Sequence, residues 1–199
     1  MNLIADSQYF PPLIFFNTLS SSSHCVFEQY ERFQKMSFMN RCRVIGGNGV
    51  ITLSIPLNGG RNQRNVVKDV RILNSERWQD RHWKTITSCY HKSPWFEYLG
   101  VDLEMLYKKR FEFLLDWNLA CFQWATDKLA ITTSYSFSDE FKLNYDPAAD
   151  VDLRGKLMPS TINELFPDEH PYPQVFADRF GFIPNMSILD FLFCVNATA

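Results

Sequence analysis

The stretch LIADSQYFPPLIFFNTLSSSSHCVFE, residues 3–28, predicts the fold class of this chain. Its apolar start, LIA, is a short predicted strand, and the two prolines that follow forbid its continuation inside a sheet. From Leu13 to Leu19 apolar residues recur at helical spacing, and the serine run ends that helix. The HCVFEQ segment, 24–29, predicts a second strand. A strand, loop, helix and strand in this order favour parallel pairing in an α/β sheet.

A β-hairpin is predicted at RCRVIGGNGVITLSIP, residues 41–56. Its glycines and asparagine supply the positive φ that a tight turn needs. Because side chains alternate along a strand, Arg41 and Arg43 share one face, opposite Cys42 and Val44. Two guanidinium groups are therefore expected to project from one side of the hairpin.

Helices are predicted for much of the middle of the chain. Apolar residues at helical spacing predict a helix over 76–91, with Ser75 as its cap, and a long helix over 102–128. Before them, RNQRNVV at 61–67 predicts a mobile loop or the entry to an edge strand, VVKDVRI. A buried strand is expected to start at Leu129.

The C-terminal part of the chain changes from polar to apolar. Residues 138–170 are acidic and contain three prolines, which predicts a loosely packed connection with at most one short helix. In HPYPQVFADRFGFIPNMSILDFLF, residues 170–193, a proline-rich turn leads to a helix capped by Asn185 or Ser187. Asp190 falls in the first turn of this helix, where the helix dipole favours a carboxylate.

Length and composition limit the architecture and the class of partner. The chain has 199 residues, 46% of them hydrophobic, which suits one compact domain over 1–199. We expect an α/β domain with a mixed, mostly parallel sheet, a β-hairpin insertion and flanking helices. A net charge of −2 disfavours general nucleic-acid binding. The sequence shows neither a signal peptide nor an apolar run long enough to span a membrane, so we expect a cytoplasmic protein without membrane insertion. The oligomeric state stays open.

The sequence predicts neither a metal site nor a cofactor. The histidines lie far apart and lack carboxylates at ligand spacing. No glycine-rich phosphate-binding motif occurs, which disfavours dinucleotide and NTPase functions. The cysteines are dispersed, without C-x-x-C spacing, and are predicted to be reduced and mostly buried. They are Cys25, Cys42, Cys89, Cys121 and Cys194.

One segment carries a strong positive bias. From Arg32 to Lys68 there are seven basic residues and no acidic residue, namely Arg32, Lys35, Arg41, Arg43, Arg61, Arg64 and Lys68. Residues 139–169 carry the opposite bias. Charge runs usually lie on solvent-exposed faces, and the sequence supports this interpretation as strongly as a functional one. The functional alternative is an anion-binding wall of Lys35, Asn40 and Arg41, with Arg43 behind, which faces Tyr9 in the YFPP loop, because arginine grips phosphate or carboxylate bidentately.

Four blocks in order carry a family resemblance. They are YFPP (9–12), QKMSFMNRCRVI (34–45), HWKTITSCYHKSPWFE (82–97) and YPQVFADRFGFIPNMSILDFLF (172–193), and together they resemble the WbqC-like protein family. The resemblance implies a role beside surface-polysaccharide and O-antigen biosynthesis. It also implies the suggested transfer of an amino-acid group, such as glycyl, onto a sugar. No catalytic set carries over from the family.

The resulting hypothesis is a group transferase. Acyl transfer needs a deprotonated nucleophile and a stabilised oxyanion. His82 is the candidate base, with Asp190 as its partner. The competing interpretation is a hydrogen-bonded structural histidine, since His82 is flanked by two tryptophans. The candidate substrate-binding residues are Tyr9, Lys35, Asn40, Arg41, Arg43, Gln174 and Asn185. The expected ligand is a nucleotide sugar or a carboxylated or acyl-donor small molecule. The alternative is a non-catalytic binding or scaffolding protein of polysaccharide assembly, whose partner surface is the aromatic SPWFEYL loop.

Overall fold

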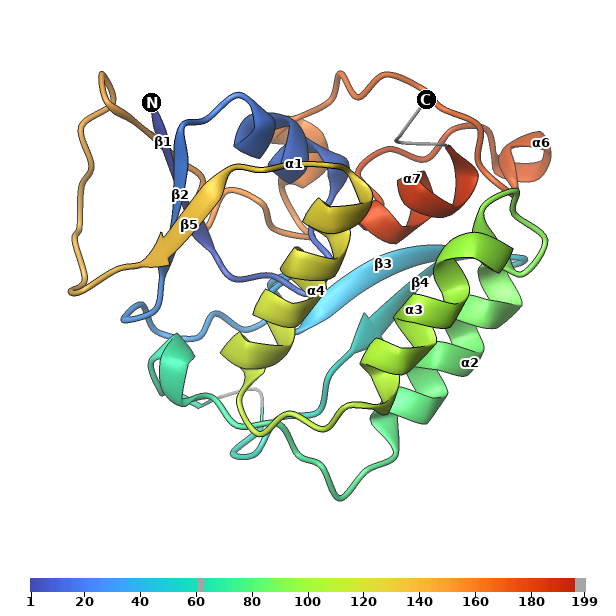
Figure 1. Ribbon diagram of the computed structural model, residues 1–199, viewed down its shortest axis with the longest axis horizontal. Helices are drawn as coiled ribbons and strands as arrows, with labels where there is room; N and C mark the ends of the chain where they lie inside the picture. Colours follow the sequence, from blue (N-terminus) through green and yellow to red (C-terminus); the bar gives the residue numbers. More distant parts are fainter. Residues whose placement is uncertain (61–62, 196–199) are drawn as a thin grey trace.

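Four parallel strands form the main sheet, in the order β5-β2-β1-β6. They are β1 (Asn2–Asp6), β2 (His24–Glu28), β5 (Ser134–Phe137) and β6 (Asp150–Asp152). Figure 1 shows this computed structural model, which describes residues 1–60 and 63–195. In register, Asn2 of β1 is opposite both His24 of β2 and Asp150 of β6. The predicted parallel pairing of the first two strands is confirmed.

The connection from β1 to β2 contains α1 (Leu13–Ser20). Phe15, Phe16 and Leu19 bury one side of this helix, as the helical spacing predicts. The hairpin is also confirmed: β3 (Arg41–Gly46) pairs antiparallel with β4 (Gly49–Ser54), and Gly49 takes φ of +106° in the turn. It forms a separate two-stranded sheet beside the parallel one, so the fold is mixed α/β in one domain.

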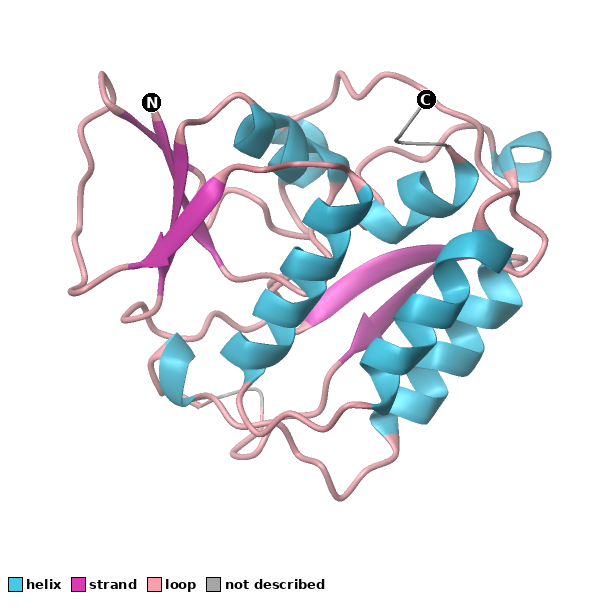
Figure 2. Cartoon of the chain, viewed as in Figure 1, coloured by secondary structure: helices cyan, strands magenta, loops and turns pink. Residues whose placement is uncertain are grey.

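Three long helices cover the hairpin. They are α2 (Trp78–Tyr90), α3 (Phe96–Lys108) and α4 (Leu114–Lys128). Figure 2 shows α2 and α3 lying side by side; α2 also packs against β3 of the hairpin, and α3 packs against α4. The prediction of one long helix over 102–128 is wrong, because the chain leaves the helix at Lys109 and pairs with residues 70–72. There the Leu114 N–H donates to the Val70 carbonyl, which fixes the start of α4.

Two other predicted features before α2 are also wrong. Residues 66–72 form no edge strand: Val67–Asp69 is the 3-10 turn η1, flanked by isolated bridges such as Arg71 to Phe113. The α2 helix begins after Arg77, so Ser75 is not its cap. Residues 61 and 62, which begin the predicted loop or strand entry, lie outside the described residues.

The C-terminal part contains more regular structure than its composition predicts. It contributes β6, which the polar segment 138–170 conceals, and three short helices: α5 (Ile162–Leu165), α6 (Ala177–Phe180) and α7 (Ile188–Cys194). The α7 helix follows Ser187 and has Asp190 in its first turn, as expected, although the Ser187 side chain makes no capping bond. The strand that starts at Leu129 was placed too early, since β5 begins at Ser134.

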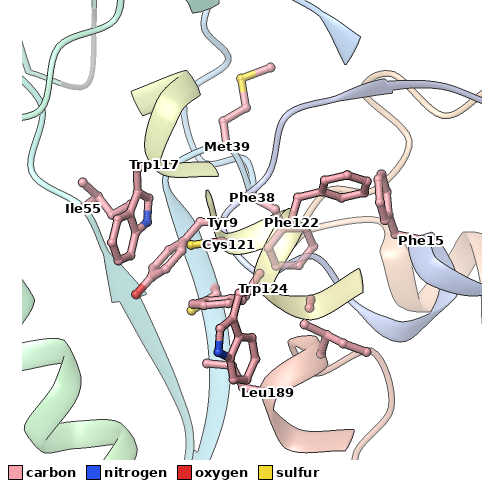
Figure 3. Packing of buried hydrophobic residues seen from close by; sticks show 14 of the residues in the cluster. Tyr9, Phe15, Phe38, Met39, Ile55, Trp117, Cys121, Phe122, Trp124 and Leu189 are labelled. Carbon is pink, nitrogen blue, oxygen red and sulfur yellow. The ribbon is translucent and has the colours of Figure 1, made fainter. Parts of the chain in front are cut away.

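A single hydrophobic core joins the two sheets and the helices. Figure 3 shows part of it, where the ring of Tyr9 lies beside Trp117 and Cys121. All five cysteines are buried and free, as predicted. Within residues 1–60 and 63–195, no helix combines the length and the apolar character needed to cross a membrane.

Candidate functional site

The carboxyl edge of the parallel sheet brings acidic side chains together. The strands β1 and β2 end at Asp6 and Glu28, and β6 ends at Asp152. Strand β1 has β2 on one side and β6 on the other. The chain runs from β1 directly to β2, whereas it reaches β6 only later, by a separate connection. In open α/β sheets, ligands bind outside the carboxyl ends of strands at such a point.

Asp6 is buried at this edge, with 3% of its surface exposed. Its Oδ2 accepts a hydrogen bond from the Gly155 N–H at 2.8 Å, and φ of +63° at Gly155 favours glycine there. Its Oδ1 has no partner among the described residues. Burial raises the pKa of Asp6 well above its usual range, and the neighbouring charge of Glu31 raises it further. Asp6 and Glu31 therefore form a pair of neighbouring carboxyl groups.

Glu28 is fully buried beside this pair. Its Oε1 accepts hydrogen bonds from the Tyr30 N–H at 2.8 Å and from the Ser138 hydroxyl at 2.7 Å. Its Oε2 has no hydrogen-bond partner among the described residues, and the nearest cation is Arg154, whose Nη1 lies 3.6 Å away. Arg154 is already held by Asp152, through Nε and Nη2. Its charge is thus divided between two carboxylates.

Four acceptor oxygens at this edge have no hydrogen-bond donor among the residues that the structure describes. They are Asp6 Oδ1, Gln8 Oε1, Glu28 Oε2 and Glu31 Oε2. A buried acceptor without a donor costs roughly 1–3 kcal/mol, so a cluster of them is expected to have a role that outweighs the cost. We call Asp6, Glu28, Glu31 and Arg154 the sheet-edge cluster. Its chemistry suits proton transfer and the binding of groups that donate hydrogen bonds.

The loop that follows β1 is strained. Phe10 takes φ of +45° although it is a bulky, buried side chain. Such a backbone costs on the order of 1–3 kcal/mol and is concentrated at functional sites. Like the sheet-edge cluster, this loop lowers the stability of the fold.

The structure brings Tyr9 and His82 together. The Tyr9 hydroxyl lies 3.0 Å from His82 Nδ1 and also hydrogen-bonds the Tyr107 hydroxyl. Burial lowers the pKa of His82 to about 4, although a hydrogen bond with the backbone of Ser54 acts in the opposite direction. His82 is therefore neutral at pH 7, and its role as a base stays a prediction.

Gln174 and Asp190 also lie together, in a different network. Asp190 is fully buried and accepts hydrogen bonds from Tyr90 at 2.8 Å, Tyr172 at 2.9 Å and Gln174 at 2.8 Å. Burial raises its pKa, and these three bonds oppose the shift. Among the described residues, no hydrogen bond joins Asp190 to His82, and the two predicted partners belong to different hydrogen-bond networks.

The four residues of the predicted anion-binding wall have different surroundings. Lys35 is exposed, whereas Asn40 donates to the Ile55 carbonyl at 2.9 Å. Arg43 donates to the Pro159 carbonyl, and Arg41 Nε is buried without a partner in the described part of the chain. The Tyr9 N–H donates to the Phe38 carbonyl, so the wall segment does contact the YFPP loop. Anion binding by these residues stays a prediction.

Asn185 lines a pocket against α1. Its Nδ2 donates to the Asn163 side chain and to the Phe166 carbonyl. Substrate binding by Asn185 is likewise a prediction.

The sequence analysis did not predict the sheet-edge cluster, although two of its acidic residues lie at recognisable positions in the sequence. Asp6 directly follows the first predicted strand and Glu28 is the last residue but one of the second, and carboxyl ends of parallel strands meet at one edge. Arg154 could not be placed, because β6 was not predicted. Within the described ranges, no group of three histidine, cysteine or acidic side chains has an arrangement that could hold a metal ion.

Comparison with known proteins gave one match. The model of the WbqC-like protein family matches residues 6–154. This range includes the whole sheet-edge cluster and the first three of the four resembling blocks, but not the block at 172–193. Searches of curated proteins and of solved structures returned no match.

Proposed function

The chain belongs to the WbqC-like protein family, and we propose that it is a group transferase of surface-polysaccharide biosynthesis that works at the sheet-edge cluster. The acceptor is an amino or hydroxyl group of a sugar. The donor is an activated glycyl or other acyl group, and the anionic part of the donor binds the basic wall of Lys35, Arg41 and Arg43.

The Asp6–Glu31 carboxyl pair carries this proposal. A buried carboxyl with a raised pKa is suited to acid–base catalysis. The pair keeps two acceptor oxygens without protein donors, Asp6 Oδ1 and Glu31 Oε2. An N–H or O–H of the acceptor is the complementary group, whereas a phosphate would be repelled there.

The transfer balances as follows. The acceptor nitrogen or oxygen attacks the carbonyl carbon of the donor, so that a C–N or C–O bond forms. The bond from that carbon to a phosphate or thiolate leaving group breaks. The proton of the acceptor passes to the Asp6–Glu31 pair and from there to solvent, while the phosphate or thiolate leaves as an anion. His82 is the second candidate for this base.

A thermal-shift screen tests the proposal. Wild type, Asp6→Asn and Arg41→Ala would be measured against nucleotide sugars, nucleoside phosphates and aminoacyl compounds, because a ligand of the native state raises the melting temperature. We expect a shift with one donor that Arg41→Ala weakens, and product formation with that donor and an amino sugar that Asp6→Asn abolishes. Turnover that survives in Asp6→Asn would contradict the proposed role of the carboxyl pair.

The second candidate function is a non-catalytic scaffold, which one observation favours. Three apolar side chains on one face of α3 are exposed: Tyr98 at 72%, Val101 at 66% and Met105 at 56%. Contiguous exposed apolar patches are typical of contact surfaces between proteins. A full thermal-shift panel without any ligand response would favour the scaffold.

A further inference from the structure

The pocket lined by Asn185 lies between α1 and the segment before the last helix. Leu13, Ile14 and Asn17 line one side of it, and residues 165–170 with Asn185 line the other. Its volume is about 350 Å³, which lies within the range of small-molecule sites. Apart from its α1 side, this pocket falls outside the residues 6–154 that match the family.

Asn185 gives the pocket a built polar wall. Its side chain is 1% exposed, and its backbone takes φ of +57°. The Asn185 N–H donates to Glu169 Oε2 at 2.5 Å, while its Nδ2 donates to Asn163 and Phe166. All the donors of Asn185 are thus engaged, and the side chain is fixed in one orientation.

The acceptors of the same wall are free. Asn185 Oδ1 and Glu169 Oε1 are both buried, and neither has a hydrogen-bond partner among the described residues. Because the amide orientation is set by two donated bonds, Oδ1 cannot be exchanged for a donor by an amide flip without losing them. A ligand of this wall must therefore donate hydrogen bonds.

Acidic side chains dominate the charge of the pocket. Asp168, Glu169 and His170 line it, and none of the described residues that line it is lysine or arginine. An anionic ligand would meet repulsion here, whereas a cation would gain charge-assisted hydrogen bonds. The remaining walls are largely apolar, through Leu13, Ile14 and Phe166.

We propose that this pocket binds a small organic cation, a primary ammonium group attached to a compact apolar body. The ammonium has three N–H donors and reaches Glu169 Oε1 and Asn185 Oδ1. The apolar body packs between α1 and Phe166. The site is separate from the sheet-edge cluster, so the inference does not depend on the proposed transferase activity.

Titration calorimetry with L-leucinamide tests the charge requirement. This probe has an ammonium group and an aliphatic side chain, and N-acetyl-L-leucinamide has the same body without the charge. We expect saturable one-to-one binding of the first and at least about tenfold weaker binding of the second, as expected for the loss of a hydrogen bond to a charged group. Equal binding of the two probes, or no saturable binding of L-leucinamide to the wild type, would overturn the proposal.

Matched variants locate the binding site. Glu169→Gln keeps an acceptor for the Asn185 N–H and removes the charge, and it should weaken L-leucinamide binding at least about tenfold. Glu164→Gln, on an exposed glutamate of α5 outside the pocket lining, should leave binding unchanged. Asn17→Trp places a bulky ring at the exposed rim and should also abolish binding in a fully folded protein.

The sheet-edge variant Asp6→Asn separates the two sites. Binding that persists in Asp6→Asn and is lost in Glu169→Gln supports the pocket. Binding that is lost in Asp6→Asn and persists in Glu169→Gln would assign the amine to the sheet-edge cluster and overturn this inference, while leaving the proposed transferase intact.

Discussion

Asp190 and Asp6 are both buried carboxylates with raised pKa values, and they differ in how completely their oxygens are bonded. Asp190 accepts three hydrogen bonds from Tyr90, Tyr172 and Gln174. Asp6 accepts one backbone bond from Gly155, leaves its Oδ1 without a partner among the described residues, and faces a second carboxylate, Glu31.

This difference separates a group that holds the fold from a group that is available for chemistry. A satisfied buried network stabilises one arrangement of the core, whereas unpaired acceptors cost stability. Removing Asp190 should therefore affect folding first, and removing Asp6 should affect activity first.

The largest expected effect is the loss of stability in Asp190→Ala. The change leaves the two tyrosine hydroxyls and the Gln174 amide without their acceptor, and it should lower the free energy of unfolding by about 4 kcal/mol. Chemical denaturation measures this, with Asp178→Ala on the exposed face of α6 as the control that should stay near wild type. A loss below about 1 kcal/mol together with inactive protein would instead give Asp190 the catalytic role predicted from the sequence.

Asp6→Asn should lower the rate of transfer by about 10²- to 10⁴-fold, as expected for a lost acid–base group. The variant should remain folded, since Asn keeps an acceptor for the Gly155 N–H. Turnover with a donor and acceptor identified by thermal shift measures the effect. Asp139→Asn, at an exposed position, is the matched control.

The same variant has a stability signature with a defined sign. Because the pKa of Asp6 is raised above its ordinary value of 3.8, the stability that Asp6 contributes is present below that pH and is lost as pH rises through the folded pKa. Asp6→Asn should therefore become relatively more stable as pH rises toward 7. If Asp6→Asn instead became less stable relative to wild type over this range, the raised pKa of Asp6 would be contradicted.

His82→Gln should change how stability depends on pH. The pKa of His82 is about 4 in the folded protein, against an ordinary value of 6.5. His82 therefore does not reduce the free energy of unfolding above pH 6.5, but it lowers that free energy by about 3 kcal/mol as the pH falls toward 4. The difference in unfolding free energy between wild type and variant, followed from pH 7 to pH 4, should contain this slope. Full loss of transfer activity at pH 7 with unchanged stability would favour His82 as the base.

The smallest expected effect is that of Arg41→Ala on donor affinity. Loss of one partly buried guanidinium should weaken binding of a phosphorylated donor about tenfold and reduce its salt dependence. Lys35→Ala, on an exposed lysine, should have a weaker effect of the same kind. Affinities measured at two ionic strengths would show both, and an unaltered affinity in Arg41→Ala would remove the basic wall from the proposal.

The sequence predicted those parts of the fold in which local pattern and tertiary packing agree. The start of the chain and the hairpin are examples, because prolines, glycines and alternating apolar residues mark their ends. The break between α3 and α4 could not be predicted, because it depends on pairing between residues 70–72 and 112–114, which are distant in sequence. The three-residue strand β6 was hidden for the same reason.

The candidate site was only partly predictable. Pairings such as Tyr9 with His82, or Gln174 with Asp190, contain the right residues but depend on distances that no local pattern encodes. The acidic ends of β1 and β2 were visible in the sequence. What made them a site was the arrival of Gly155 and Arg154 beside them, through contacts between residues that are distant in sequence.

The place of β6 also bears on how the chain folds. The first strand of the sequence is an inner strand of the sheet, and one of its two neighbours is separated from it by 148 residues. During synthesis, β1 can pair with β2 early, yet its other edge stays open until most of the chain has left the ribosome. Such long-range pairing slows folding, so this family fold is expected to rely on a late closing step and on protection of that open edge until then.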